Sequence, residues 1–405
     1  MKTKLKEVKH GSIVTPKGFK ATGLHSGVKR KRKDLGILYA EKPAQAAAVY
    51  TLNQVVAAPI TVTKETLSKE KKVQAVIVNS GNANACTGEQ GIIDAKEMQE
   101  VTAEAFQTEA DYVAVASTGV IGEALPMETI RSHIPKLQPG RTEEDATAFN
   151  EAILTTDTFT KSICYQTKIE GQDVYVAGSA KGSGMIEPNM GTMLAFITTD
   201  AVIDSATLDS ILKEVVDRTF NSVTVDGDTS TNDMVLVLAS GEAGHGHLSP
   251  DHPEWENFVL AFEQTCEFLA KQIARDGEGA TKLIEVEVKG AQSEEKARQV
   301  AKAIVGSSLV KTAVYGNDAN WGRIIAAVGY SGVEINPETI DLSLGEIPIL
   351  RQSRPVSYEE EEATEYLKGE TIHITVDLHV GDAKAKAWGC DLTYDYVRIN
   401  ASYRT

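Results

Sequence analysis

The chain has 405 residues, of which 42% are hydrophobic and 24% are charged, so it has the composition of a globular protein with room for a large core. Its net charge of −16 argues against nucleic acid or an anionic membrane surface as a main partner, and no stretch approaches the roughly 18 apolar residues of a membrane span. The four cysteines are far apart and the N-terminus lacks the apolar core of a secretion signal, which predicts a cytoplasmic protein with reduced thiols.

Predicted strands and amphipathic helices are distributed along the whole chain. Apolar and β-branched runs predict strands at residues 75–80, 112–118, 173–180, 192–200, 234–240, 283–290 and 372–381. Helices with one apolar face are predicted from Ser205, from Trp255 to Arg275, and from Ser293 to Gly306, with this glycine as C-cap. Several strands are almost continuously apolar, which indicates sheets covered on both faces. The mixture predicts an α/β or α+β layered fold.

Three polar motifs are interpreted as structural. The basic run from Lys29 to Lys33 is read as a solvated loop in preference to a phosphate or nucleic-acid patch. VDGDTSTND (225–233) is read as a tight polar turn near a site and not as a calcium loop, because Thr231 stands where that loop needs glycine. The histidines of the 245–252 segment are assigned to a mobile loop and not to a metal site, so no metal is expected.

The stretch KGSGMIEPNMGTMLAFITTD (181–200) raises the question of chemistry, because a strand-like run begins at Thr192 directly after a glycine-rich loop. If the Thr192 hydroxyl attacked the Gly191 carbonyl and the peptide bond broke, Thr192 would carry a free α-amine beside its hydroxyl, which is a known activated nucleophile. An α-amine with a pKa of about 7.7–8.0 is roughly 10–15% neutral at pH 7, against ~0.04% for an ordinary lysine. Lys181 is therefore better suited to binding a substrate carboxylate. Chemistry alone predicts an N-terminal-nucleophile acyltransferase or amidohydrolase.

An acyl-transfer site also needs hydrogen-bond donors for the oxyanion. The turn VASTGVIG (115–122) follows a predicted strand and offers Thr118 and Gly119. An ordinary strand-terminal turn explains the same pattern, so both interpretations stay open on this motif alone.

The extended stretch KGSGMIEPNMGTMLAF closely resembles the self-processing segment of the glutamate N-acetyltransferase (ornithine acetyltransferase) family of arginine biosynthesis. The resemblance covers essentially the whole chain, in the segments GLHSGVKRKRKDLGIL, NSGNANACTG, VASTGVIG, TTDTFTK, VDGDTSTND, ARDGEGATKLIEV, YGNDANWGR and YVRINASYRT. It implies a self-processing N-terminal-nucleophile-type fold of stacked sheets flanked by helices. It also implies cleavage before Thr192 into an α chain of residues 1–191 and a β chain of residues 192–405, which together form one catalytic unit and an α2β2 heterotetramer.

The same resemblance implies the site residues. The nucleophile is Thr192, the oxyanion hole is Thr118 and Gly119, and the substrate contacts are Thr155, Lys181, Thr192, Glu278, Asn400 and Thr405. The family most often has alanine before the cut, where this chain has Gly191. The implied reaction moves an acetyl group from N2-acetylornithine to glutamate without a cofactor. Many members also accept acetyl-CoA, and we expect the bifunctional form here.

Two alternatives remain at this stage. A self-processing aminopeptidase or amidase would use the same nucleophile with water as the final acceptor, but it does not account for the full set of matching segments. A non-enzymatic binding protein would leave the chain uncut, with Thr192 merely starting a strand.

Overall fold

The structure is a computed structural model that describes residues 5–187 and 193–402. A large sheet carries the strands β1 (Lys6–Glu7), β2 (Phe19–Leu24), β3 (Leu35–Tyr50), β4 (Lys72–Asn82), β5 (Val113–Val120), β6 (Lys161–Ile169), β7 (Gln172–Lys181), β8 (Leu194–Thr199) and β9 (Met234–Ala239). Its order is β1-β6-β7-β8-β9-β3-β4-β5, and β2 pairs with β3. Strands from both sides of residue 192 therefore belong to one sheet.

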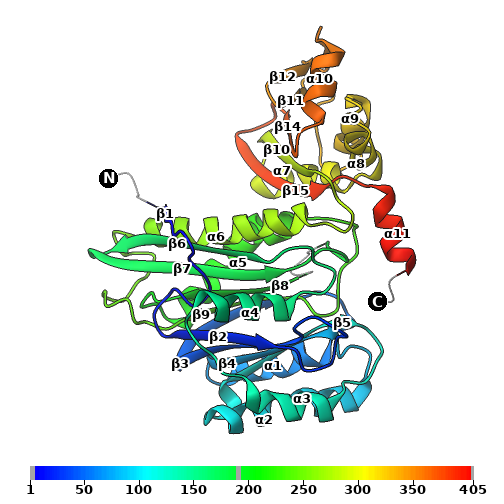
Figure 1. Ribbon diagram of the computed structural model, residues 1–405. Helices are drawn as coiled ribbons and strands as arrows, with labels where there is room; N and C mark the ends of the chain where they lie inside the picture. Colours follow the sequence, from blue (N-terminus) through cyan, green and yellow to red (C-terminus); the bar gives the residue numbers. More distant parts are fainter. Residues whose placement is uncertain (1–4, 188–192, 403–405) are drawn as a thin grey trace.

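The long strand β3 turns this sheet into two stacked halves (Figure 1). Its first part pairs with β2 and β4, its last part pairs with β9, and the register with β4 shifts between Tyr39 and Ala44. One buried cluster combines Val76 of β4 with Phe196 of β8 and Leu236 of β9, so the inner faces of the two halves share a core. Since β8 and β9 are buried along their whole length, they read as continuous apolar runs in the sequence.

Helices cover the outer faces of both halves (Figure 1). The helices α5 (Ser205–Arg218) and α6 (Trp255–Arg275) share a core with β6 to β9, whereas α1 (Ala58–Lys69), α2 (Gly88–Phe106) and α3 (Met127–His133) share one with β4 and β5. Helix α4 (Glu143–Ile153) packs on β2, and its Phe149 ring meets Phe196 edge-on at 5.6 Å between centroids.

A second sheet forms a separate layer after α6, at the top of Figure 1. Its strands, in the order β13-β12-β11-β14-β10-β15, are β10 (Leu283–Ala291), β11 (Asp341–Leu344), β12 (Ile347–Arg351), β13 (Arg354–Pro355), β14 (Thr371–Asp377) and β15 (Ala383–Cys390). Around it lie α7 (Glu294–Gly306), α8 (Ser308–Tyr315), α9 (Trp321–Gly329) and α10 (Glu360–Leu367). The chain then returns through α11 (Tyr394–Ser402) towards the first sheet.

The layered α/β fold predicted from the sequence is confirmed, and so are most predicted elements. Helix α6 has the predicted bounds. The apolar face predicted for the helix that starts at Ser205 is buried in α5, at Leu208, Ile211, Leu212, Val215 and Val216. Two details are wrong. The strand predicted at 372–381 ends at Asp377, because His379 adopts a φ of 51° and the chain turns there. Gly306 is the last residue of α7 and not its cap, since Ser307 is the C-cap of α7 and also the N-cap of α8.

Candidate active site

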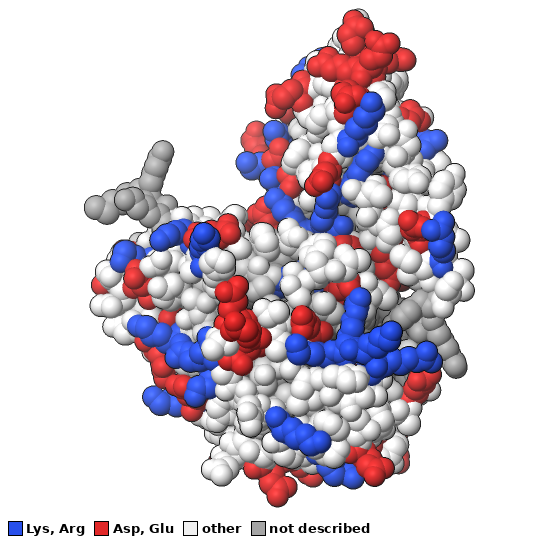
Figure 2. Space-filling view, in the orientation of Figure 1, with Lys and Arg blue, Asp and Glu red and all other residues white. Residues whose placement is uncertain are grey.

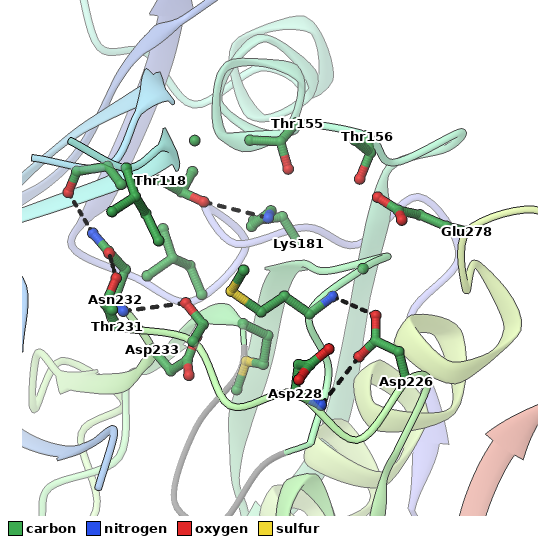
Figure 3. Close-up of a pocket in the computed structure, with 18 of the residues that line it drawn as sticks. Thr118, Thr155, Thr156, Lys181, Asp226, Asp228, Thr231, Asn232, Asp233 and Glu278 are labelled. Atoms are coloured by element: carbon green, nitrogen blue, oxygen red, sulfur yellow. Dashed lines mark hydrogen bonds between the residues drawn. The ribbon is translucent and has the colours of Figure 1, made fainter. Parts of the chain in front are cut away.

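A cavity of about 200 Å³ lies where the ends of several strands meet α6 and α11, and its lining comes from segments far apart in the sequence (Figure 3). Six residues expected at the site line it, namely Thr118, Gly119, Thr155, Lys181, Glu278 and Asn400. Gly191, Thr192 and Thr405 lie outside the described residues, but Met193, which follows Thr192 in the sequence, also lines the cavity. The resemblance thus selected residues that the fold brings together.

The end of β5 lies unusually close to the end of β4. The two strands are parallel, with Gly81 opposite Gly119, and the register breaks at Asn82. A Cβ atom added to Gly119 would lie 2.3 Å from the carbonyl carbon of Gly81, and Gly119 has a φ of 136°. Only glycine meets both conditions without strain. The glycine is therefore required by the backbone geometry at this edge of the cavity.

Lys181 ends β7 inside the cavity and is the only Lys or Arg among the described residues that line it. Its Nζ donates a hydrogen bond to Oγ1 of Thr118 at 3.4 Å (Figure 3). Burial lowers the pKa of the Lys181 ammonium, and the nearby Asp157 carboxylate partly offsets this effect. A cation in this position is suited to binding a carboxylate.

Behind Lys181 lies a buried charge network formed by Asp157, Lys161 and Asp276. The Lys161 ammonium contacts Asp157 at 2.8 Å and Asp276 at 2.6 Å. Although burial acts to raise the pKa of the Asp157 carboxyl, the cations of Lys161 and Lys181 outweigh it and hold that pKa well below its usual range. Asp157 also accepts the backbone N–H of Thr155 at 3.0 Å and that of Gly182 at 2.7 Å. One carboxylate therefore fixes two segments of the cavity wall.

Glu278 lines the cavity shortly after the end of α6. Its carboxylate accepts a hydrogen bond from the Asn400 side chain at 2.7 Å, which ties α11 to the cavity. The Glu278 backbone N–H donates to Ser183 at 3.0 Å. Gly184 lies flat against the carboxylate, because a Cβ atom there would be only 2.3 Å from the Glu278 Cδ. Glu278 is thus held from two separate segments, the loop at residues 183–184 and helix α11.

The segment 225–233, which the sequence suggested only as a polar turn near a site, forms a further part of the wall (Figure 3). The Asp226 carboxylate accepts the backbone N–H groups of Met185 and Ile186, both at 2.7 Å, and so shapes the loop that leads to residue 187. Asp228 is exposed at the cavity. Burial raises the pKa of Asp233 well above its usual range, and its Oδ2 has no hydrogen-bond partner among the described residues.

The basic loop between β2 and β3 differs from the solvated loop predicted for it. Lys29 is partly buried and its Nζ donates to the Leu154 carbonyl at 2.8 Å, while burial lowers its pKa to about 8. Arg32 donates to the Asp157 carbonyl at 3.1 Å. Arg30 and Lys31, in the middle of the run, are exposed, and neither forms a hydrogen bond or ion pair within the described chain. The loop therefore packs against the segment that carries Thr155.

The histidines of the 245–252 segment do not converge on one point. They contact three different residues, Val202, Asp204 and Glu170. Within the described ranges no group of three or more His, Cys, Asp and Glu side chains is arranged to hold a metal ion. Of the helices in residues 5–187 and 193–402, none combines the length and apolar character needed to cross a bilayer.

Comparison with known proteins identifies the family. A model of the ArgJ family matches residues 20–405. The chain is 62% identical over 398 residues to the arginine biosynthesis bifunctional protein ArgJ of Geobacillus kaustophilus, which covers 98% of this chain and 97% of that protein. The protein of the same name from Halalkalibacterium halodurans is 62% identical over 396 residues, covering 98% and 96%. A crystal structure of the Bacillus halodurans protein is 57% identical, with a TM-score of 0.46, and covers 47% of this chain and 100% of the solved chain. The chain therefore belongs to the ArgJ family of arginine-biosynthesis enzymes.

Proposed function

We propose that the enzyme is a glutamate N-acetyltransferase that moves an acetyl group from N2-acetylornithine to glutamate through an acetyl ester on Thr192. The observation that carries this proposal is the cavity itself. It gathers Thr118, Gly119, Lys181 and Glu278 from distant segments, and Met193, next to the proposed nucleophile, belongs to the same wall.

The enzyme first activates itself. The Thr192 hydroxyl attacks the carbonyl carbon of Gly191, the peptide C–N bond breaks, and an ester forms. Water then hydrolyses the ester, which leaves a Gly191 carboxylate and a free α-amine on Thr192. A glycine before the cut imposes no Cβ atom on the approach of the hydroxyl.

The exchange then follows in two half-reactions. The α-amine of Thr192 takes the hydroxyl proton while the oxygen attacks the acetyl carbonyl of N2-acetylornithine. Donors contributed by Thr118 and Gly119 stabilise the oxyanion, and the proton passes to the departing nitrogen as its C–N bond breaks. After ornithine leaves, the neutral α-amine of glutamate attacks the ester, and the Thr192 oxygen leaves with a proton. This double displacement needs neither metal nor cofactor.

The charges of the cavity fit these substrates. Lys181 is suited to the α-carboxylate that both amino acids carry, and Glu278 is suited to an ammonium group such as that of ornithine. Thr155 and Asn400 supply neutral hydrogen-bonding groups at the wall, and the resemblance adds Thr405. We further propose acetyl-CoA as a second acetyl donor, an α2β2 assembly and a cytoplasmic location, the last in keeping with four free cysteines in the structure.

The test combines a denaturing gel, mass spectrometry and an exchange assay. The purified enzyme is expected to consist of two fragments that meet at Gly191 and Thr192, and to convert acetylornithine and glutamate into equal amounts of ornithine and N-acetylglutamate without CoA. The Thr192→Ala variant is expected to stay uncut and inactive. Full activity of an intact chain would overturn the proposal, and release of acetate in place of N-acetylglutamate would favour the aminopeptidase or amidase alternative.

A further inference from the structure

The basic loop at Lys29–Lys33 packs against two segments that line or adjoin the cavity. The Nζ of Lys29 donates to the carbonyl of Leu154 at 2.8 Å, and the next residue, Thr155, lines the cavity. On its other side Lys29 lies against Gly81, since a Cβ atom there would be 2.7 Å from the Lys29 Cγ, and Gly81 pairs with Gly119 of the cavity wall. The loop is thus wedged between two parts of the candidate active site.

The loop presents cationic groups that no acidic side chain neutralises. Arg30, Lys31 and Arg32 are exposed, and none of them forms an ion pair with a carboxylate in the described part of the chain. Arg32 uses one nitrogen for main-chain carbonyls, which leaves further N–H donors. Figure 2 shows Lys and Arg side chains gathered over the region where Figure 1 has this loop. In a chain with a net charge of −16, such a patch is a specific local feature.

The size of the cavity limits how much of acetyl-CoA can enter it. At about 200 Å³ it is smaller than the roughly 300–1,000 Å³ of most small-molecule pockets. Acetyl-CoA carries its acetyl group at the end of a long pantetheine arm and its phosphates at the far end, so the nucleotide must remain outside the cavity. Phosphate groups bind to arginine and lysine through charge-assisted hydrogen bonds.

We propose that Arg30, Lys31 and Arg32 bind the phosphate groups of acetyl-CoA while its acetyl group enters the cavity. This inference rests on the proposed use of acetyl-CoA as second donor. It assigns no role to Arg30 and Lys31 in the exchange with acetylornithine, because that donor has no phosphate. The loop therefore separates the two activities of one site.

The test removes the two exposed charges that have no partner in the described chain. In the double variant Arg30→Gln/Lys31→Gln, the KM for acetyl-CoA in N-acetylglutamate synthesis is expected to rise roughly tenfold, because one exposed ion pair contributes up to about fivefold in affinity. The KM for acetylornithine in the exchange is expected to stay within about twofold. The matched control Arg354→Gln/Lys384→Gln removes two exposed charges from the second sheet and should change neither value.

Two further measurements identify the phosphates as the ligand. The KM of the unmodified enzyme for acetyl-CoA should rise with salt, and this dependence should weaken in the double variant. Acetyl-pantetheine, which lacks all phosphates, should be used equally well by both proteins. An unchanged KM for acetyl-CoA in the double variant, or an equal loss of synthesis and exchange, would overturn the proposed phosphate-binding role of Arg30, Lys31 and Arg32 and leave the proposed acetyltransferase function intact. If the unmodified enzyme makes no N-acetylglutamate from acetyl-CoA but still catalyses the exchange, then acetyl-CoA is not a donor, and the proposed phosphate-binding role is also wrong.

Discussion

Replacing Lys161 with methionine tests the buried charge network behind the cavity. The Lys161 side chain is 0% exposed, and its partners Asp157 and Asp276 are 0% and 2% exposed. Methionine has a similar length but carries no charge, so the variant leaves two carboxylates buried beside an apolar side chain.

The expected loss in the free energy of unfolding is about 3–5 kcal/mol, because removing one partner of a buried ion pair leaves an uncompensated charge in a poorly solvated environment. The matched control is Lys168→Met. Lys168 forms an ion pair of similar length with Asp173, at 2.7 Å, but its side chain is 64% exposed. Exposed pairs contribute at most about 1 kcal/mol, so the control should lose far less.

The loss in the free energy of unfolding caused by Lys161→Met should also depend on pH. Since the pKa of Asp157 is held low in the folded enzyme, its carboxylate stabilises the fold above the unfolded pKa of about 3.9, and this contribution is lost as the pH falls through the folded value. Without Lys161 the folded pKa of Asp157 should rise, so protonation at mildly acidic pH relieves the buried charge. The destabilisation by Lys161→Met should therefore shrink between pH 7 and pH 4.5.

Urea unfolding followed by circular dichroism measures both effects, in a Thr192→Ala background so that each protein is one uncut chain. The double variant Lys161→Met/Asp276→Asn removes one of the two stranded carboxylates and should recover part of the loss. A destabilisation below about 1 kcal/mol, equal to that of the exposed control, would refute the claim that this network holds the cavity wall together.

Three further predictions concern the cavity. Gly119→Ala should lower the kcat of the exchange by about 100-fold, because the new Cβ would lie 2.3 Å from the Gly81 carbonyl carbon and displace a proposed oxyanion donor. The control Gly122→Ala, at a φ of 81° but with open space around the new Cβ, should keep most of the activity. Glu278→Gln should raise the KM for acetylornithine by roughly tenfold, and an unchanged KM would contradict the pairing with its ammonium. Asp233→Asn should raise the melting temperature relative to the unmodified enzyme more at pH 8 than at pH 4, as melting curves at both pH values would show. Because the folded pKa of Asp233 is raised, its contribution to stability is fully present below the unfolded value near 3.9 and is lost as the pH rises through the folded value, whereas asparagine stays neutral.

The sequence predicted the site residues better than the contacts that hold them. Thr118, Lys181 and Glu278 stand in long segments that match the family, and the structure brings them to one cavity, while their roles stay predictions. Asp157 and Lys161 were visible in TTDTFTK, and Asp276 in ARDGEGATK, but nothing in the sequence links positions more than a hundred residues apart. Their pairing depends on the tertiary fold.

The sequence likewise predicted some elements of the fold and missed others. The buried strand β9 could be located because it combines an apolar run with β-branched residues. The 16-residue strand β3 was missed, since its alanines and the central Glu41, Lys42 and Pro43 do not form an uninterrupted apolar run. This polar middle coincides with the shift in register that lets the two halves of the sheet stack, so the feature that hid the strand also shapes the fold.

The two aspartates at the start of the 225–233 segment have different surroundings, and this difference bears on how one cavity could serve the two proposed amino-acid substrates. Asp226 is committed to two backbone N–H groups and is also 3.2 Å from the Tyr396 hydroxyl, so it shapes the wall and has little capacity left for a ligand. Asp228 is exposed at the cavity, and its carboxylate forms no hydrogen bond or ion pair within the described chain. In the proposed double displacement only one amino acid occupies the cavity at a time, so Lys181 could bind the α-carboxylate in both half-reactions. Glu278, the proposed partner of the ornithine ammonium, is held by its hydrogen bond to Asn400, whereas the Asp228 carboxylate has no such bond. Varying Asp228, and not Asp226, therefore tests whether a second carboxylate at the cavity separates donor from acceptor selectivity.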